Sequence, residues 1–284
     1  MPRLIFLLAV LAVAVFAETM LWKVSKGGKT LYLGGTVHVL RPSDYPLPEA
    51  YEHAFASADT LVFETDMAAL QSPGYVKQLQ AQMMCGPGES LQRLLSRQTY
   101  AALAAYTREQ GIPMEILDRM KPPMAVITLL TVKLQAMGMT EPGVDAYYFQ
   151  KASKSGKKIR WFESPQAQTA MLASLGREDV NGMVRQTLAE MDGYMTVMQT
   201  IIAAWRHGDA AVLERLGKKY LMHDSPQDYR RLIIERNRQW MSTISTMFAN
   251  AETELVLVGA LHLVGPDGLV ARLKRKGYRV EQLR

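Results

Sequence analysis

The alternation of apolar and polar residues predicts short strands near both ends of the chain and helices between them. Two apolar runs on either side of the turn SKGGK, at residues 20–24 and 31–33, have the pattern of a β-hairpin. Later apolar runs predict strands at residues 60–65, 157–164 and 278–283. Strands at both ends of a largely helical chain are typical of an α+β fold.

Helical spacing dominates the middle of the chain. A first helix is predicted over residues 49–58, and the stretch from residue 90 to residue 250 is largely helical. Ser90 has the position of an N-cap for a helix that runs to about residue 110, and Pro123 opens another that runs to about residue 137. Further helices are predicted over residues 144–155, from Pro165 onward, over 226–250 and over 269–276.

One pattern occurs twice, near the two ends of the chain. Each copy has a four-residue apolar run, the motif Gly-x-x-His, an apolar residue and a proline four residues after the histidine. The copies are Gly35 to His38 with Pro42, and Gly259 to His262 with Pro266. A helix and then a strand are predicted after each copy. The pattern indicates an internal duplication, with halves at residues 18–67 and 251–284 and a helical middle at residues 68–250.

The duplicated histidines are the first candidates for chemistry. Each lies where an apolar strand meets a turn, which is where a sheet presents side chains to a ligand. The glycine three residues earlier leaves bare backbone, so the opposite half can approach closely. If the two strands pair at the centre of the sheet, His38 and His262 converge. Two imidazoles and a carboxylate commonly bind a divalent metal. The alternative is that both histidines only bond backbone at strand ends.

Three strands end in a glutamate that could complete such a site. Glu64 belongs to the same half as His38 and is the best candidate for a third ligand or a general base. Glu163 is the second candidate. Glu281 has strongly basic neighbours, which favours a surface ion pair, and Asp66 has the position of a helix cap.

Two polar residues stand out on the predicted helix at 226–250. Asn237 falls on the apolar stripe of this helix, and Arg236 lies beside it. A polar residue on a core-facing stripe needs a hydrogen-bonding partner. Arg236 and Asn237 are therefore expected to brace a buried carboxylate or to bind a substrate carbonyl, and a purely structural brace is equally compatible with the pattern.

Composition and charge place the protein in a class. Residues 1–17 combine an early arginine with a short apolar run and a small residue at the end, as in a secretory signal peptide. The run is shorter than the roughly 20 residues of a membrane-spanning helix, so we expect an exported, periplasmic or secreted protein. An uncleaved N-terminal anchor is the alternative. Cys85 is the single cysteine, which excludes an intramolecular disulfide.

The net charge of +6 does not indicate nucleic-acid binding. The two densest basic runs, at residues 154–160 and 272–279, each stand just before a strand-like segment, as solvated helix ends and turns do. Nucleic-acid sites instead gather basic residues on one face together with stacking aromatics.

Six segments, in this order over nearly all of residues 18–284, resemble the TraB/GumN family. They are LYLGGTVHVL, FET, EPGVDAYYF, KKIRWFESPQAQ, ERNRQW and LVLVGALHLVGPDGLVARLKRKGYRVEQL. That family includes the Tiki proteins, which are metal-dependent proteases acting on Wnt, and it is related to erythromycin esterase and to the haem-binding ChaN proteins. The resemblance implies one α+β domain at residues 18–284, with a central mixed sheet built from two pseudo-symmetric halves and a large helical insertion.

The resemblance also implies roles for particular residues. It places His38, Glu64 and His262 at the metal or catalytic centre, and it marks Asp145, Glu163, Arg236 and Asn237 as motif positions of less defined role. The segment WFES departs from the more usual Leu-Glu-Thr step of the family, so its two aromatic residues are expected to reshape the pocket.

These observations predict a metal-dependent hydrolase, with a peptidase as the leading interpretation. His38, His262 and a glutamate would hold Mn²⁺, Co²⁺ or Zn²⁺, and Glu64 or Glu163, whichever is not a ligand, would take a proton from water. The substrate would be a peptide or protein. The rival interpretation is a non-enzymatic protein that binds haem, metal or a peptide in the same crevice. A third is a scaffold that acts only through protein contacts.

Overall fold

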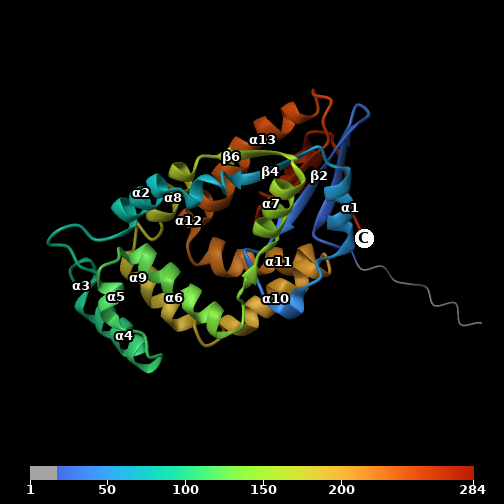
Figure 1. Ribbon diagram of the computed structural model, residues 1–284. Coiled ribbons are helices and arrows are strands. Elements are labelled where there is room, and N and C mark those ends of the chain that lie inside the picture. The colour runs from blue at the N-terminus through green and yellow to red at the C-terminus, as the bar shows by residue number, and fades with distance from the viewer. Residues whose placement is uncertain (1–17) are drawn as a thin grey trace, which may run out of the picture.

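A computed structural model describes residues 18–284 of the chain (Figure 1). The predicted signal peptide at residues 1–17 lies outside the described residues. A six-stranded sheet runs through the molecule in the order β6-β4-β7-β2-β1-β8, with β1 antiparallel to both of its neighbours and the other pairs parallel. Its strands are β1 (Leu21–Lys26), β2 (Lys29–Thr36), β4 (Thr60–Thr65), β6 (Lys158–Glu163), β7 (Glu254–Gly259) and β8 (Arg279–Gln282). The mixed α+β architecture predicted from the sequence is confirmed.

The strands of the two predicted halves meet at the centre of the sheet. β2 and β7 are parallel neighbours, with Thr36 opposite Gly259. Their apolar residues are almost completely buried, as expected for strands covered on both faces. Because parallel strands end at the same edge of a sheet, the two Gly-x-x-His turns emerge side by side.

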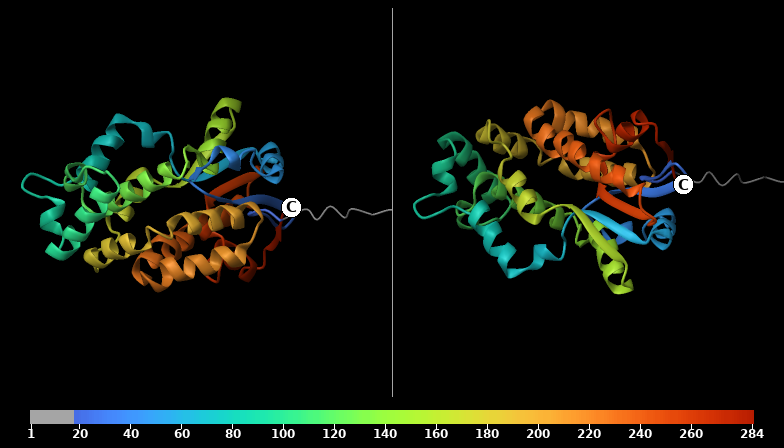
Figure 2. Two further views of the ribbon diagram at one scale, coloured as in Figure 1. Left: turned by 90° about the horizontal axis from the view of Figure 1, so that it is seen from below. Right: turned by 90° about the horizontal axis from the view of Figure 1, so that it is seen from above.

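The helices that follow the two turns lie on opposite faces of the sheet. α1 (Glu49–Ser57) leads from β2 to β4, and α14 (Leu269–Arg275) leads from β7 to β8 (Figure 2). Opposite faces are expected when two right-handed crossovers leave adjacent parallel strands in opposite directions. The symmetry is approximate, because β1 separates β2 from β8.

Two further helices complete the layers over the sheet. α7 (Val144–Ser155) joins α1 on one face, where the Tyr148 ring stacks on Tyr51, and α13 (Arg236–Met247) joins α14 on the other. The predicted boundaries of α7 agree with the structure. A short second sheet pairs β3 (Val39–Leu40) with β5 (Glu141–Pro142), which the sequence pattern did not predict.

The helical middle extends away from the sheet (Figure 1), and its part at residues 91–129 and 180–191 has its own hydrophobic cluster, whereas Ile202, Trp205 and Leu213 belong to the core of the sheet. Its helices are α2 (Pro73–Met83), α3 (Leu91–Leu94), α4 (Arg97–Glu109), α5 (Met114–Asp118), α6 (Pro122–Ala136), α8 (Pro165–Ala173), α9 (Val180–Glu190), α10 (Tyr194–Arg206), α11 (Ala210–Gly217) and α12 (Pro226–Tyr229). Among residues 18–284, no helix combines the length and the apolar character that crossing a bilayer requires.

Two predicted helices are interrupted in the structure. Ser90 does cap a helix, but that helix ends at Leu94, and α4 begins two residues after Leu95 with Ser96 as its own N-cap. A serine side chain that binds a backbone N–H favours such a new start over continuation. The predicted helix at 226–250 contains a π-helical stretch, η4 (Arg230–Glu235), directly before α13. π-Helical segments are common at functional sites, and this one precedes Arg236.

Candidate functional site

The two Gly-x-x-His turns touch through bare backbone. A β-carbon on Gly35 would lie 3.1 Å from the Cα of Ala260 and 2.8 Å from the Cγ of Met20. The prediction that glycine allows the two halves to approach closely is therefore confirmed at Gly35. Its carbonyl accepts hydrogen bonds from the Tyr51 hydroxyl and the Trp205 indole, both at 2.7 Å. These two buried donors fix the first turn against the helices.

His262 is held as a neutral imidazole of defined tautomer. Its Nε2 lies 3.0 Å from Nη1 of Arg236, which can only donate, so Nε2 accepts and Nδ1 carries the proton. Nδ1 then donates to the amide oxygen of Asn237 at 2.8 Å. The Asn237 amide nitrogen donates to the carbonyls of His262 and Asp267, which sets its orientation. Burial lowers the pKa of His262 to about 3, against the opposing influence of Glu64.

Arg236 lies at the centre of the site. Its side chain is buried and donates from Nη2 to Glu64 at 2.6 Å and from Nε to Glu163 at 2.9 Å. The Trp240 ring covers the guanidinium at 4.6 Å, and its indole N–H donates to Glu163 at 2.8 Å. The expected brace of a buried carboxylate is present, and it holds two carboxylates rather than one. Substrate binding by Arg236 stays a prediction.

Glu64 is a largely buried carboxylate, 12% exposed, with a partner on each oxygen. Oε1 accepts from the backbone N–H of Gly259 at 2.7 Å and lies 3.9 Å from Nε2 of His262, while Oε2 accepts from Arg236. Burial by itself would raise the pKa of Glu64, but the charges of Arg236 and His38 and the hydrogen bond from the Gly259 N–H hold it below its ordinary value. Glu64 is therefore ionised at neutral pH.

His38 is more open than His262. Its side chain is 67% exposed, and Nδ1 lies 2.9 Å from Oδ2 of Asp145 at the start of α7. The Asp145 carboxylate raises the pKa of His38 above its ordinary 6.5 through its charge and its hydrogen bond. His38 is therefore an imidazolium at neutral pH.

The motif EPGVD positions His38. A β-carbon on Gly143 would overlap the main chain of Val37 and His38, so only glycine permits this approach. The Val144 N–H donates to the Val37 carbonyl at 3.0 Å, next to the β3–β5 pair. Asp145 follows and binds the His38 ring. Pattern reasoning alone missed this role, and the resemblance to a family was the only signal for it.

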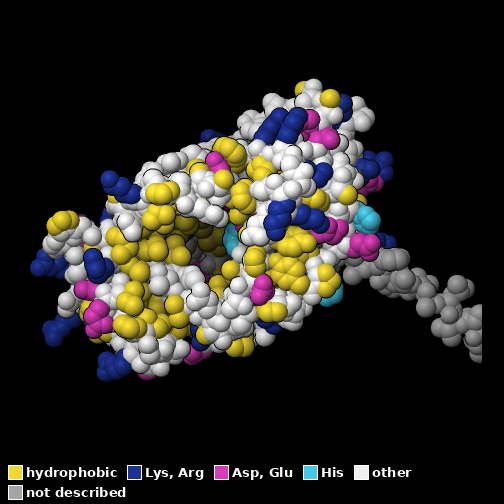
Figure 3. Space-filling model, viewed as in Figure 1, with side chains coloured by type: hydrophobic (Ala, Val, Ile, Leu, Met, Phe, Trp, Pro, Cys, Tyr) yellow, Lys and Arg dark blue, Asp and Glu magenta, His cyan; other side chains and the backbone are white. Residues whose placement is uncertain are grey.

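A cavity with two adjoining lobes lies against these residues. The first lobe has a volume of about 390 Å³ and the second about 380 Å³. In the space-filling view, a hollow walled largely by hydrophobic side chains opens on this face, with a histidine visible at its inner wall (Figure 3). Both lobes are lined by Thr36, His38, Glu64, Leu232 and Arg236. Thr65, Asp145, Gln168 and Met171 line the first lobe only, and His262, Met198, Ile201 and Leu213 the second only. The cavity thus brings both predicted histidines and Glu64 together.

The other predicted residues are placed as follows. Glu281 lies on β8 and accepts from Nε of Arg279 at 2.9 Å, as expected for a surface ion pair. Asp66 accepts from the N–H groups of Ala68 and Ala69, but the N-cap of the short helix η2 (Ala69–Gln71) is Ala68 and not Asp66. In the segment WFES, Phe162 stacks on Trp240 with the ring centroids 5.0 Å apart. This aromatic pair and the Trp240 contact with Glu163 were not foreseen from the sequence.

The cavity contains side chains of the kinds that bind divalent metals, but their donor atoms do not point at one position. Two imidazoles and a carboxylate line it, and such groups are common ligands of a divalent ion. However, Arg236 engages both Glu64 and His262, and Asp145 engages His38. Within residues 18–284, no group of three or more His, Cys, Asp or Glu side chains is arranged to hold an ion. In this arrangement Glu64 and His262 bind the guanidinium of Arg236 and do not fit a metal ion.

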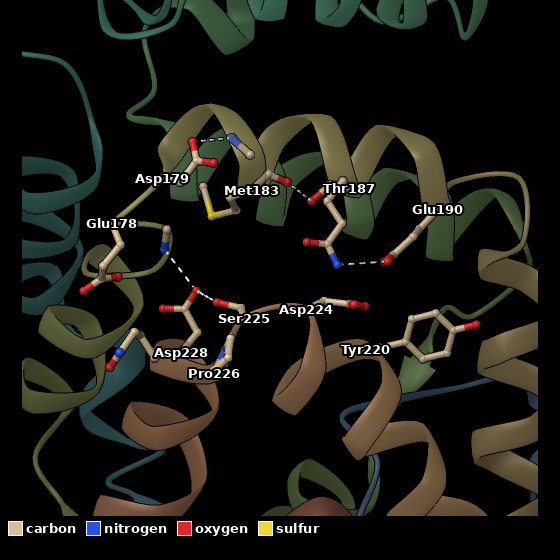
Figure 4. A pocket seen from close by; sticks show the side chains of 14 residues that line it. Glu178, Asp179, Met183, Thr187, Glu190, Tyr220, Asp224, Ser225, Pro226 and Asp228 are labelled. Carbon is tan, nitrogen blue, oxygen red and sulfur yellow. Dashed lines mark hydrogen bonds between the residues drawn. The ribbon is translucent and has the colours of Figure 1, made fainter.

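Another cavity, of about 370 Å³, is lined by acidic side chains beside α9 and α12 (Figure 4). Its carboxylates have structural partners: Asp179 caps α9 through the Gly182 N–H, and Asp228 accepts from Ser225 and Gly176. Glu190 accepts from Gln186 at 3.1 Å. Because these groups serve the fold, the acidic character of this cavity indicates no ligand.

The chain is similar to several known proteins. The profile of the TraB/PrgY/gumN family matches residues 20–282. The Uncharacterized protein YbaP of Escherichia coli (strain K12) is 23% identical over 87% of this chain and 89% of its own length. Proteins named Metalloprotease TIKI1 are 22% identical in Danio rerio and 23% identical in Homo sapiens, over 93% of this chain. This chain covers 63% and 62% of those two proteins. No solved structure matches significantly.

Proposed function

Because the chain belongs to the TraB/PrgY/gumN family, we propose that it is an exported hydrolase that cleaves peptide or amide bonds in the two-lobed cavity. The observation that carries the proposal is the buried cluster of Glu64, Arg236 and His262 at the wall of that cavity. The name of one relative, Metalloprotease TIKI1, supports this reaction class. Buried charged groups that converge on a cavity are the usual mark of an active site.

The side chains on this wall include a proton acceptor, a proton donor and cationic groups, which are the groups that amide hydrolysis needs. Glu64 would accept the proton of a water molecule as that water attacks the carbonyl carbon. The carbonyl oxygen becomes negatively charged, and Arg236 or the His38 imidazolium would stabilise it. When the C–N bond breaks, the leaving nitrogen needs a proton, which the His38 imidazolium or the protonated Glu64 can supply. Each proton transfer therefore has a donor and an acceptor in the site.

The resting arrangement keeps Glu64 weak as a base. A carboxylate with a pKa of about 2 has little tendency to take a proton at neutral pH. If a substrate carbonyl draws Arg236 away, Glu64 loses its ion-pair partner while it stays buried, and its pKa rises. Substrate binding would then create the base at the moment when it is needed, and Arg236 would have moved to the oxygen where negative charge develops.

A divalent ion would bind in the cavity only after a rearrangement of the site. His38, His262 and Glu64 would be its ligands only after Arg236 has released Glu64 and His262 and after His38 has lost a proton. When bound, such an ion would polarise the carbonyl and the attacking water. The steps above do not depend on it.

The test compares two glutamate variants of the mature protein. Glu64→Gln keeps the shape of the side chain but cannot take the proton, so hydrolysis should fall on the order of 10² to 10⁴-fold. Glu281→Gln changes an exposed glutamate on β8 and should leave the rate unchanged. Both are assayed against an internally quenched peptide library, with and without Mn²⁺, Co²⁺ or Zn²⁺ and with chelator. Equal rates for the two variants would contradict the proposal.

The rival function is ligand binding without turnover. The cavity could hold haem or a peptide, and in that case wild type would bind one of them tightly but hydrolyse nothing under any metal condition. Glu64→Gln would then change affinity only modestly. The peptide screen therefore decides between an enzyme and a binding protein.

A further inference from the structure

In the part of the chain that the structure describes, several buried oxygen atoms without a hydrogen-bond partner belong to residues that line the first lobe of the cavity. Within residues 18–284, four buried side-chain oxygen atoms have no hydrogen-bond partner. Three of them, Oγ1 of Thr36, Oγ1 of Thr65 and Oδ1 of Asp145, belong to residues that line this lobe. Buried polar atoms in folded proteins nearly always have a partner, so three unpaired atoms at one lobe indicate a ligand that supplies the missing bonds.

The positions of the two threonines suit a ligand that lies across the strand ends. Thr36 is the last residue of β2 and Thr65 the last of β4, with β7 between these strands. Their exposed fractions are only 4% and 6%. Rotation about χ1 moves Oγ1 between staggered positions without backbone movement, so each hydroxyl can turn towards a ligand in the lobe.

The hydrogen-bonding properties of the three oxygen atoms match those of a peptide main chain in a ligand. A threonine hydroxyl both donates and accepts, whereas an ionised carboxylate only accepts. An extended peptide presents N–H and C=O groups in alternation, and these match two hydroxyls and one carboxylate oxygen. Oδ2 of Asp145 is already used by His38, so Oδ1 is the atom that remains for a substrate N–H.

We propose that Thr36 and Thr65 bind the main chain of an extended peptide substrate beside the reacting bond, with Oδ1 of Asp145 as a further acceptor. This rests on the proposed function, since Thr36 also lines the second lobe together with Glu64 and Arg236. The apolar second lobe then takes a hydrophobic side chain of the same peptide. The acidic cavity in Figure 4 lacks this feature, because none of the four unpaired oxygens belongs to its lining.

The experiment replaces each hydroxyl by a methyl group of similar size. Thr36→Val and Thr65→Val remove hydroxyls that have no internal partner, so the unfolding midpoint should stay the same or rise. Thr99→Val is the matched control. Its buried hydroxyl accepts from Ser96 and Arg185, so this change should lower the unfolding midpoint and leave the kinetics unchanged.

The kinetic probe is an internally quenched octapeptide with leucine on both sides of its central bond. Losing one neutral hydrogen bond should raise KM about 3- to 10-fold, with kcat nearly unchanged. A second measurement titrates the same octapeptide into the Glu64→Gln protein, alone and combined with Thr36→Val or Thr65→Val, by calorimetry. The dissociation constant should rise by the same factor.

The outcomes separate this inference from the proposed function. Cleavage with unchanged KM in both threonine variants overturns the inference and leaves the hydrolase intact. Binding without cleavage, weakened by Thr36→Val or Thr65→Val, supports the inference and overturns the hydrolase. A loss of stability as large as that of Thr99→Val means that the hydroxyls serve the fold, which overturns the inference. The inference is also overturned if the octapeptide binds neither wild type nor the Glu64→Gln protein.

Discussion

Replacing Arg236 with methionine tests whether the buried cluster is an ion-pair network. Methionine keeps much of the length of the side chain but removes the guanidinium, so Glu64 and Glu163 lose their shared cation. The two carboxylates are only 12% and 10% exposed. Water can therefore replace only part of the lost interaction, and the fold must accommodate two largely buried negative charges.

The expected loss of stability is about 3 to 5 kcal/mol at pH 7, as is usual when one partner of a buried ion pair is removed. The direction of the Glu64 pKa agrees with this expectation, because Arg236 is one of the groups that hold the pKa below the ordinary 4.5. A loss of this size is a large part of the roughly 5 to 15 kcal/mol that stabilises a typical domain.

The sign of the pH dependence follows from the direction of the same shift. Because the folded protein holds the pKa of Glu64 below its unfolded value, the stabilisation is present above about pH 4.5 and is lost as the pH falls towards about 2. In Arg236→Met, burial instead raises the pKa of Glu64, so its ionisation opposes folding as the pH rises. The difference in stability between wild type and variant should be largest near pH 7 and should shrink towards pH 4.

The assay is urea unfolding of both proteins at pH 4, 5.5 and 7. The further changes Glu64→Gln and Glu163→Gln in the same chain should restore part of the lost stability, because they remove the unpaired charges. Arg279→Met, which breaks an exposed ion pair on β8, is the control and should have no measurable effect. A loss below about 1 kcal/mol that does not vary with pH would refute the reasoning about a buried network.

Three further predictions concern other parts of the chain. Gly143→Ala should destabilise the fold by several kcal/mol and reduce hydrolysis, because its methyl group would displace the main chain of His38; thermal unfolding and the octapeptide assay check this. Metal analysis of the purified protein tests whether an ion enters the cavity: if one binds after Arg236 has moved, wild type should hold more divalent ion than His38→Ala and His262→Ala, and equal contents would end the metal proposal. The intact mass of the exported protein should show that residues 1–17 have been removed, whereas retention of Met1 would contradict the predicted signal peptide.

The sequence by itself determined the architecture and the main candidates for the site. The repeated Gly-x-x-His pattern placed two apolar strands at equivalent positions, and β2 and β7 do pair at the centre of the sheet. Local patterns decide such features, since a strand buried on both faces must be apolar and a turn that touches another backbone must contain glycine. For the same reason, Glu64 at the end of its strand could be singled out, and Asn237 on an apolar stripe could be expected to have a buried partner.

Only the tertiary structure decided how these residues pair. Arg236 was expected to serve one carboxylate, but the folded chain brings it between Glu64 and Glu163 and against His262. The unpaired hydroxyls of Thr36 and Thr65 have no signature in the sequence either, because a threonine at a strand end is ordinary. The charge states of His38 and Glu64 depend on which groups face them from strands and helices distant in sequence. Burial and Coulomb interactions act through space, so they are fixed only when the whole chain has folded.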